Sequence, residues 1–164
     1  MSAVRSGALT ERYVRYDSRG YYIDGSLGRG AYGIVLRVGH RNKYASLYAR
    51  KEIPKRDVDY QALRNEVKLI QQASHRHVVK IIDYYEDSEN FFIVMEPVAN
   101  ANLHQYLKQT TSHRTQLPPD WRAFGKRRLQ LFYFIRCLAT ALKEIHRRGI
   151  RHRDIKPENI LVQG

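Results

Sequence analysis

The sequence has a single cysteine, few acidic residues and no long uninterrupted hydrophobic run. Because Cys137 is alone, no intrachain disulfide is possible, which favours a reducing, intracellular location in the cytoplasm or nucleus. The most apolar stretch, residues 129–145, contains three charged side chains and is shorter than the roughly 20 apolar residues of a membrane span. Charged residues also interrupt the N-terminal stretch, so no secretory signal is predicted. We therefore expect a soluble protein that makes no membrane contact.

Acidic residues are scarce relative to basic ones. The 164 residues include 16 Asp and Glu against 29 Lys and Arg, a formal net charge of +13. Such an excess fits a nucleic-acid binder, a solvated surface, or a chain whose acidic partner segment is absent. No repeated basic–aromatic block, paired Cys/His zinc spacing or DNA-reading helix accompanies the charge. We therefore do not expect nucleic-acid binding.

The first half of the chain reads as strands around one helix. Residues 1–20 are polar and aperiodic, and we interpret them as a mobile arm. Apolar residues then follow strand patterns, and a helical spacing of apolar residues predicts a helix over 59–73. The expected strands cover residues 21–27, 34–38, 47–53, 78–85 and 91–95, with an acidic turn at 86–90 between the last two.

The second half is helical in character. We expect helices over 103–109 and 126–148, with Gly149 as the C-cap of the second and a loop over 110–125 between them. A strand-rich half joined to a helical half predicts an α+β fold in two parts, 21–97 and 98–164. The long helix carries an apolar stripe, made of Leu129, Phe132, Ile135, Leu138, Leu142 and Ile145.

A glycine cluster joins the first two expected strands. Residues 28–35 read Gly-Arg-Gly-Ala-Tyr-Gly-Ile-Val. Glycines let a backbone approach a polyphosphate closely, and the amides can then bind its oxygens. A flexible hairpin tip explains the same pattern equally well. Because a strand follows the glycines, a Rossmann dinucleotide site is excluded.

Lys51 and Ala49 lie two residues apart in the third expected strand. Both side chains should therefore point to the same face of the sheet, the side of the glycine cluster. An exposed strand lysine is the usual alternative. Glu66 favours a functional role, because it falls on the apolar face of the following helix, where a buried carboxylate needs a cation. A lysine–carboxylate pair between strand and helix would hold the ammonium toward a phosphate.

The strongest signal is His-Arg-Asp-Ile-Lys-Pro-Glu-Asn at residues 152–159. This string follows the long helix and Gly149, so it begins a loop. Asp154 can accept a proton from an attacking hydroxyl, Lys156 can neutralise charge on a transferred phosphoryl, and Asn159 can ligate Mg²⁺ through its amide oxygen. A merely charged turn would not require these residues in this order and register.

Together these motifs resemble a eukaryotic protein kinase domain of the serine/threonine type, over nearly the whole chain from Tyr21. Residues 28–35 resemble its glycine-rich loop, residues 48–51 its Val-Ala-Ile-Lys, and Glu66 the glutamate of its C-helix. Residues 75–79 look like its His-x-Asn-Ile-Val, and residues 92–98 resemble its fifth strand, gatekeeper and hinge. Lys156 in the catalytic loop is typical of serine/threonine rather than tyrosine kinases.

The resemblance implies a kinase-like α+β fold, with a complete antiparallel upper lobe and a partial lower lobe that ends after the catalytic loop. It also implies ATP and Mg²⁺ as cofactors and a protein serine or threonine as substrate. Asp154 and Lys156 are the implied catalytic residues and Asn159 the implied metal ligand. The implied ATP-binding residues are Leu27, Gly28, Arg29, Gly30, Ala31, Tyr32, Gly33, Val35, Ala49, Lys51, Glu66, Met95 as gatekeeper, and Glu96 and Val98 of the hinge.

The chain also departs from the family pattern. Arg151 replaces the apolar residue usual before His-Arg-Asp, and His77 replaces an asparagine. The sequence contains no Asp-Phe-Gly and stops ten residues after Asp154, so we expect a truncated domain with little phosphoryl transfer of its own. The alternative is a non-catalytic, kinase-like module that binds nucleotide or a partner. In either case the apolar face at 129–145 would be exposed and would favour partner docking.

Overall fold

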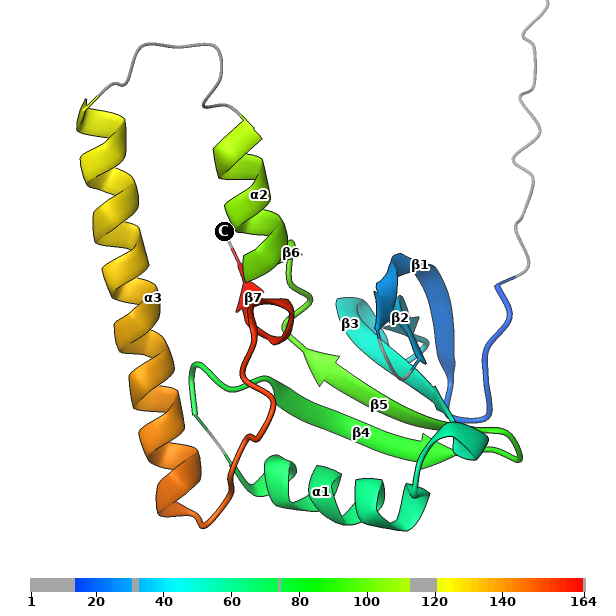
Figure 1. Cartoon of the computed structure of the whole chain (residues 1–164). Helices are drawn as coiled ribbons and strands as arrows, with labels where there is room; N and C mark the ends of the chain where they lie inside the picture. The colour runs from blue at the N-terminus through cyan, green and yellow to red at the C-terminus, as the bar shows by residue number, and fades with distance from the viewer. Residues whose placement is uncertain (1–13, 31–32, 74, 113–120, 164) are drawn as a thin grey trace, which may run out of the picture.

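The computed structural model describes residues 14–30, 33–73, 75–112 and 121–163, and the first half of the chain forms a five-stranded sheet (Figure 1). All neighbouring strands are antiparallel, in the order β1-β2-β3-β5-β4. The five expected strands are therefore present. They are β1 (Tyr21–Gly30), β2 (Gly33–His40), β3 (Lys43–Pro54), β4 (Lys80–Glu86) and β5 (Asn90–Glu96).

One helix, α1 (Tyr60–Gln72), crosses a face of the sheet after a single 3-10 turn, η1 (Lys55–Asp57). Asp59 caps its start, because the carboxylate accepts hydrogen bonds from the amides of Gln61 and Ala62, each at 3.1 Å. Such a cap satisfies amides that have no partner within the helix. The helix predicted over 59–73 is confirmed to within one residue at each end.

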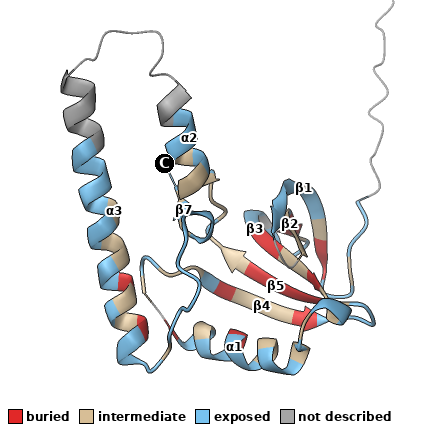
Figure 2. Cartoon of the chain, in the orientation of Figure 1, coloured by how far each residue is buried: buried red, intermediate tan, exposed pale blue. Residues whose placement is uncertain are grey.

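The sheet carries a buried cluster on each face, and buried residues gather in β3, β4 and β5 (Figure 2). Phe91 and Phe92 belong to different clusters, as the alternation of side chains along a strand requires. The cluster on the α1 side contains Ile53, Val67, Ile81, Phe91 and Ile93. The cluster on the opposite face, called here the outer face, contains Tyr21, Val38, Tyr48, Tyr85, Phe92 and Val94.

The second half is built on a two-residue strand pair, β6 (Ala101–Asn102) with β7 (Leu161–Val162), which the sequence does not predict. β6 leads directly into α2 (Leu103–Ser112). Asn102 and Gln105 cap that helix reciprocally, because each side-chain oxygen accepts the other's backbone amide, at 2.8 and 2.9 Å. The antiparallel pair therefore joins the segment after β5 to the end of the chain.

The long helix α3 (Trp121–Arg147) lies beside α2 (Figure 1). The Tyr106 ring meets the Phe134 ring edge-on at 5.6 Å, and the Tyr106 hydroxyl donates to Gln130 Oε1 at 2.7 Å. α3 begins five residues before the predicted start and α2 ends after the predicted end, so the loop expected over 110–125 is too long. The apolar stripe begins only at Leu129, so its spacing does not locate the start of the helix, and residues 113–120 lie outside the described residues.

The C-terminal end of α3 confirms the predicted cap. Gly149 has φ +75° and donates to the His146 carbonyl at 2.9 Å, while Ile150 donates to the Ile145 carbonyl at 3.0 Å. These two bonds make a Schellman motif, in which glycine tolerates the left-handed conformation best. The chain therefore turns sharply into the loop that carries Asp154.

The apolar stripe of α3 is exposed along its first half (Figure 2). Leu129, Phe132 and Ile135 are 56%, 58% and 63% exposed, whereas Ile145 near the end of the helix is 7% exposed. The exposed face expected from the sequence is therefore present over the first half of the stripe. Docking of a partner on it stays a prediction.

The interpretation of residues 1–20 as a mobile arm needs a correction at its end. Gly20 is buried, and the Asp17 side chain is bonded to groups of β3 and β4. Polar composition suggests a solvated segment, but it does not reveal that one carboxylate meets a buried cation. Residues 1–13 lie outside the described residues.

Candidate active site

The strand register gathers four of the predicted site residues on one face of the sheet. Val35 of β2 pairs with Lys51 of β3, and Ala49 of β3 pairs with Met95 of β5. Directly paired residues share a face, as do residues two apart in one strand. Val35, Ala49, Lys51 and Met95 therefore project to the same side, which is the side that α1 covers.

The glycine-rich hairpin consists of the end of β1 and the start of β2. Gly28 has φ +151°, and no described atom lies within 4 Å of where its Cβ would be. Gly33 has φ +139°, but a Cβ there would collide with the backbone oxygen of Glu52. The structure thus gives Gly33 a packing role in β2–β3 pairing and leaves open space at Gly28. Leu27, Arg29 and Gly30 are exposed in the same hairpin, and Ala31 and Tyr32 lie outside the described residues.

Lys51 is half-buried, and its surroundings act on its charge in opposite directions. Burial lowers the pKa of the ammonium, while the negative charges of Glu66 and Asp154 raise it and the positive charge of Lys156 lowers it. The net effect is a pKa below the ordinary lysine value. Groups from β3, α1 and the loop after α3 are therefore near enough to interact electrostatically.

Glu66 is exposed on α1, which corrects the expectation that it would be buried on the apolar face. The buried residue of this helix is its neighbour Val67. A helical stripe is broad, so spacing alone did not separate a residue at its centre from one at its edge. No ion pair within 4.0 Å is found between the described side chains of Glu66 and Lys51, so Glu66 acts on Lys51 through its field.

Asp154 is exposed in the loop between α3 and a short 3-10 helix, η3 (Pro157–Asn159). Its Oδ2 lies 3.0 Å from the Lys156 ammonium and accepts a hydrogen bond from the side-chain nitrogen of Asn159 at 2.8 Å. Hydrogen bonds from Lys156 and then Asn159 lower the pKa of the Asp154 carboxyl, and the charges of Lys156 and His152 act in the same direction. The Asp154 carboxyl is therefore ionised at neutral pH.

The loop is held at both ends by backbone contacts. The Schellman motif at Gly149 fixes its start. At its end, the Leu103 amide donates to the Ile160 carbonyl at 2.7 Å, next to the β6–β7 pair. Within the loop, the Asp154 amide donates to the His152 carbonyl at 2.8 Å, and the intervening Arg153 has φ +59°. These constraints place Asp154, Lys156 and Asn159 together.

The predicted hinge follows β5. Glu96 turns its carboxylate to the Lys80 ammonium, at 2.9 Å, so its side chain is engaged at the sheet surface. Glu96, Pro97 and Val98 also line an open groove of about 840 Å³, together with the start of β3 and the C-terminal end of α1. Neither Lys51 nor any described residue of the glycine hairpin lines this groove, so the groove differs from the expected nucleotide cleft.

Asn159 is the residue assigned to Mg²⁺. Its amide nitrogen donates to Asp154 Oδ2 at 2.8 Å and to the Asp154 carbonyl at 2.9 Å, which leaves the amide oxygen outside these contacts. Among the described residues, no group of three or more His, Cys, Asp or Glu is placed to hold a metal ion. The Asn159 amide oxygen fits Mg²⁺ as one ligand of an incomplete set, because Mg²⁺ commonly takes one or two protein oxygens and completes its shell with phosphates and water.

Residues 21–164 match the family model described as the protein kinase domain. The chain belongs to this family. This kinase domain is 31% identical over 143 residues to the serine/threonine-protein kinase RAD53 of Saccharomyces cerevisiae, and 32% identical over 152 residues to the probable serine/threonine-protein kinase nek2 of Dictyostelium discoideum. The alignments cover 86% and 87% of this chain, but only 16% and 34% of those relatives.

A solved structure supports the same assignment. The crystal structure of Rad53 1–466 in complex with AMP-PNP matches this kinase domain with a TM-score of 0.66 and 30% identity, over 88% of this chain and 35% of that one. The chain thus spans about a third of that solved chain. In the described part of this kinase domain, no helix has the length and apolar character to cross a membrane.

One residue of this kinase domain escapes the sequence reasoning. Arg50 is 5% exposed, in the position where Val-Ala-Ile-Lys has isoleucine. A charged residue in a central strand was a usable signal, because such a residue needs a partner when it is buried. The sequence does not reveal which residue is the partner, because that residue, Asp17, lies 33 positions away from Arg50.

Proposed function

We propose that the chain carries the nucleotide-binding and phosphoryl-transfer elements of a serine/threonine protein kinase, which transfers the γ-phosphoryl of ATP to a protein hydroxyl. The observation that carries the proposal is that charges from two other elements act on Lys51 of β3, namely Glu66 from α1 and the Asp154–Lys156 pair from the loop after α3. The nucleotide analogue in the related Rad53 structure supports ATP as the ligand.

In this proposal the upper lobe binds the nucleotide. The backbone around Gly28 approaches the phosphates, and Lys51 contacts them with its ammonium, which the carboxylate of Glu66 helps to keep charged. Val35, Ala49 and Met95 bound the base from one face of the sheet, and backbone groups of Glu96 and Val98 meet its edge.

The loop after α3 contributes the reacting groups. Asp154 orients the substrate hydroxyl and accepts its proton, for which an ionised carboxylate is required. Lys156 lies 3.0 Å from that carboxylate and offers positive charge to the transferred phosphoryl. Asn159 would hold Mg²⁺ through its amide oxygen, and Mg²⁺, when bound, supplies positive charge to the phosphates.

The alternative proposal is a kinase-like module that binds nucleotide or a partner without catalysis. Residues 1–164 include Asn159 but no Asp-Phe-Gly, so these residues alone offer a single asparagine in place of the aspartate–asparagine metal pair of the family. For the same reason we expect this chain alone to transfer phosphoryl weakly or not at all. Nucleotide binding therefore tests the site, and phosphoryl transfer separates the two proposals.

The binding experiment measures the affinity of a fluorescent ATP analogue for the chain and for Lys51→Met. Loss of a charge-assisted contact to phosphate should weaken binding about ten-fold or more. Lys43→Met is the matched control, because Lys43 is an exposed lysine at the start of the same strand. Equal affinities for the chain and for Lys51→Met would contradict the proposed site.

The transfer experiment follows ³²P from labelled ATP into a serine-containing protein. Transfer that disappears in both Lys51→Met and Asp154→Asn would identify the chain as catalytic. Binding that depends on Lys51, without transfer, would support the non-catalytic module instead.

A further inference from the structure

The outer face of the sheet contains a buried arginine. Arg50 neighbours Lys51 in β3, so its side chain points to the opposite face, where its guanidinium carbon lies 5.2 Å from the centre of the Phe92 ring. Only 5% of the residue is exposed. A cation removed from water in this way is costly unless negative or polar groups surround it.

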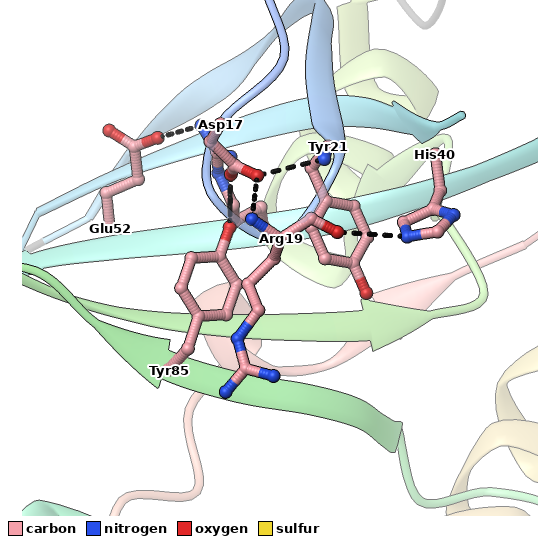
Figure 3. Close-up of polar contacts among 7 residues, drawn as sticks. Asp17, Arg19, Tyr21, His40, Glu52 and Tyr85 are labelled. Carbon is pink, nitrogen blue, oxygen red and sulfur yellow. Dashed lines mark hydrogen bonds and ion pairs between the residues drawn. The ribbon is translucent and has the colours of Figure 1, made fainter. Parts of the chain in front are cut away.

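Three side chains supply those groups (Figure 3). Arg50 Nη1 lies 2.6 Å from Asp17 Oδ2 and donates to the Tyr85 hydroxyl at 3.2 Å, and Arg50 Nη2 lies 2.5 Å from Glu52 Oε1. The Tyr85 hydroxyl in turn donates to Asp17 Oδ2 at 2.6 Å. Burial and this bond raise the pKa of Tyr85, so its hydroxyl stays a proton donor. Asp17 Oδ2 therefore accepts hydrogen bonds from two buried donors, Arg50 Nη1 and the Tyr85 hydroxyl.

The other oxygen of Asp17 organises the chain around it. Asp17 Oδ1 accepts the backbone amides of Arg19 and Tyr21, each at 2.9 Å. The Arg41 amide donates to the Gly20 carbonyl at 3.0 Å, and the His40 ring meets the Arg19 carbonyl at 3.1 Å, at the end of β2. The turn is therefore built to present one carboxylate oxygen to Arg50.

We propose that Arg50 and Tyr85 form a carboxylate-binding site on the outer face of the sheet, and that Asp17 occupies it in cis. Residues 14–20, called here the strap, are then fastened across this face by that carboxylate. If Asp17 left, Arg50 Nη1 and the Tyr85 hydroxyl would lose their shared acceptor within a buried cluster. Arg50 Nε is already buried without a hydrogen-bond partner in the described structure, so further loss would be severe. The inference does not depend on the proposed kinase function.

Limited digestion with trypsin tests the strap directly. Arg19 lies inside the bonded turn, while Arg15 lies before it. Release of fragment 1–19 therefore measures opening of the turn, and release of fragment 1–15 serves as the internal reference. In Asp17→Asn, and in Arg50→Met, cleavage after Arg19 should be about ten-fold faster or more, because trypsin needs the turn to open. Asp24→Asn is the matched control, since Asp24 pairs with Arg37 at the sheet surface. Unchanged cleavage after Arg19 in both variants would overturn the proposal.

A double variant keeps the proposal testable if Asp17→Asn does not fold. Arg50→Met removes the buried cation that Asp17 serves, so Asp17→Asn/Arg50→Met should unfold at a higher denaturant concentration than Asp17→Asn alone. Tyr85→Phe keeps the ion pair and should accelerate cleavage after Arg19 less than Asp17→Asn does. Destabilisation that simply adds up in the double variant would show that Asp17 and Arg50 act independently, and the proposed site would fall.

Discussion

Lys51 is the residue on which burial and charge oppose each other most clearly. Burial lowers the pKa of its ammonium, and Glu66 and Asp154 raise it without restoring the ordinary lysine value. Since the folded pKa is the lower one, the unfolded chain binds more protons at alkaline pH. The contribution of Lys51 to stability therefore increases with pH from the folded pKa to the unfolded value of about 10.4. The two carboxylates favour its charged form.

Glu66→Gln should lower the pKa of Lys51 further, because it removes the larger of the two effects that raise it. The measurement is an NMR titration of the lysine side chains, with the Lys51 signal assigned through Lys51→Arg. Glu89→Gln, in the exposed turn between β4 and β5, is the control and should leave this pKa unchanged. A Lys51 pKa that stays constant or rises in Glu66→Gln would show that the two groups do not interact as described.

Single residues were predictable from the sequence where a motif defines them. Lys51, Glu66 and Asp154 were singled out by spacing and order, and in the structure the charges of Glu66 and Asp154 act on the pKa of Lys51. Their functional roles stay predictions. The burial of Glu66 was predicted wrongly, because helical spacing gives a face but not its edge. Arg50 was missed, because what makes a buried charge tolerable is a partner distant in sequence, here Asp17.

At the level of elements, the glycine hairpin combines two different requirements. Gly33 must be glycine because β2 passes close to the Glu52 backbone of β3. Gly28 has a comparable backbone conformation but open space beside it, where the proposed phosphates would lie. A motif that looks uniform in sequence therefore divides into a position fixed by packing and a position that we propose for binding.

Gly33→Ala should destabilise the fold by roughly 2–4 kcal/mol, through backbone strain and collision with the Glu52 carbonyl. Gly28→Ala should cost less, about 1–2 kcal/mol from strain alone, but should weaken nucleotide binding. Chemical denaturation compares the stabilities, and fluorescent nucleotide titration compares the affinities. Equal destabilisation by both substitutions would mean that the two glycines do not differ in role.

Elements with local signals were predicted well, and those made by distant pairing were not. α1 has its cap at Asp59 and Gly149 follows the end of α3, and both signals lie within one turn of the boundary they set. β6 and β7 have two residues each, so no periodicity exists to detect them. Their pairing depends on the loop returning beside the segment after β5.

Across the whole molecule, burial is distributed unevenly between the two halves. The sheet has a buried cluster on both faces, whereas α3 has Ala141 and Ile145 buried near its end and large apolar residues exposed before them. A net charge of +13 opposes self-association, while an exposed apolar face favours it. Since salt screens the charge but leaves the apolar attraction, association should increase with salt.

The variant Leu129→Gln/Phe132→Gln/Ile135→Gln should abolish most of this association and lower the fluorescence of a hydrophobic dye several-fold. Because these side chains are 56%, 58% and 63% exposed, each change should alter stability by only about 0.5 kcal/mol or less. Sizing chromatography with light scattering at low and high salt measures the association. Leu69→Gln on α1, where Leu69 is 51% exposed, is the control for a single exposed leucine elsewhere. If the unaltered chain is monodisperse at both salt concentrations and binds no dye, the exposed apolar face of α3 does not exist in solution.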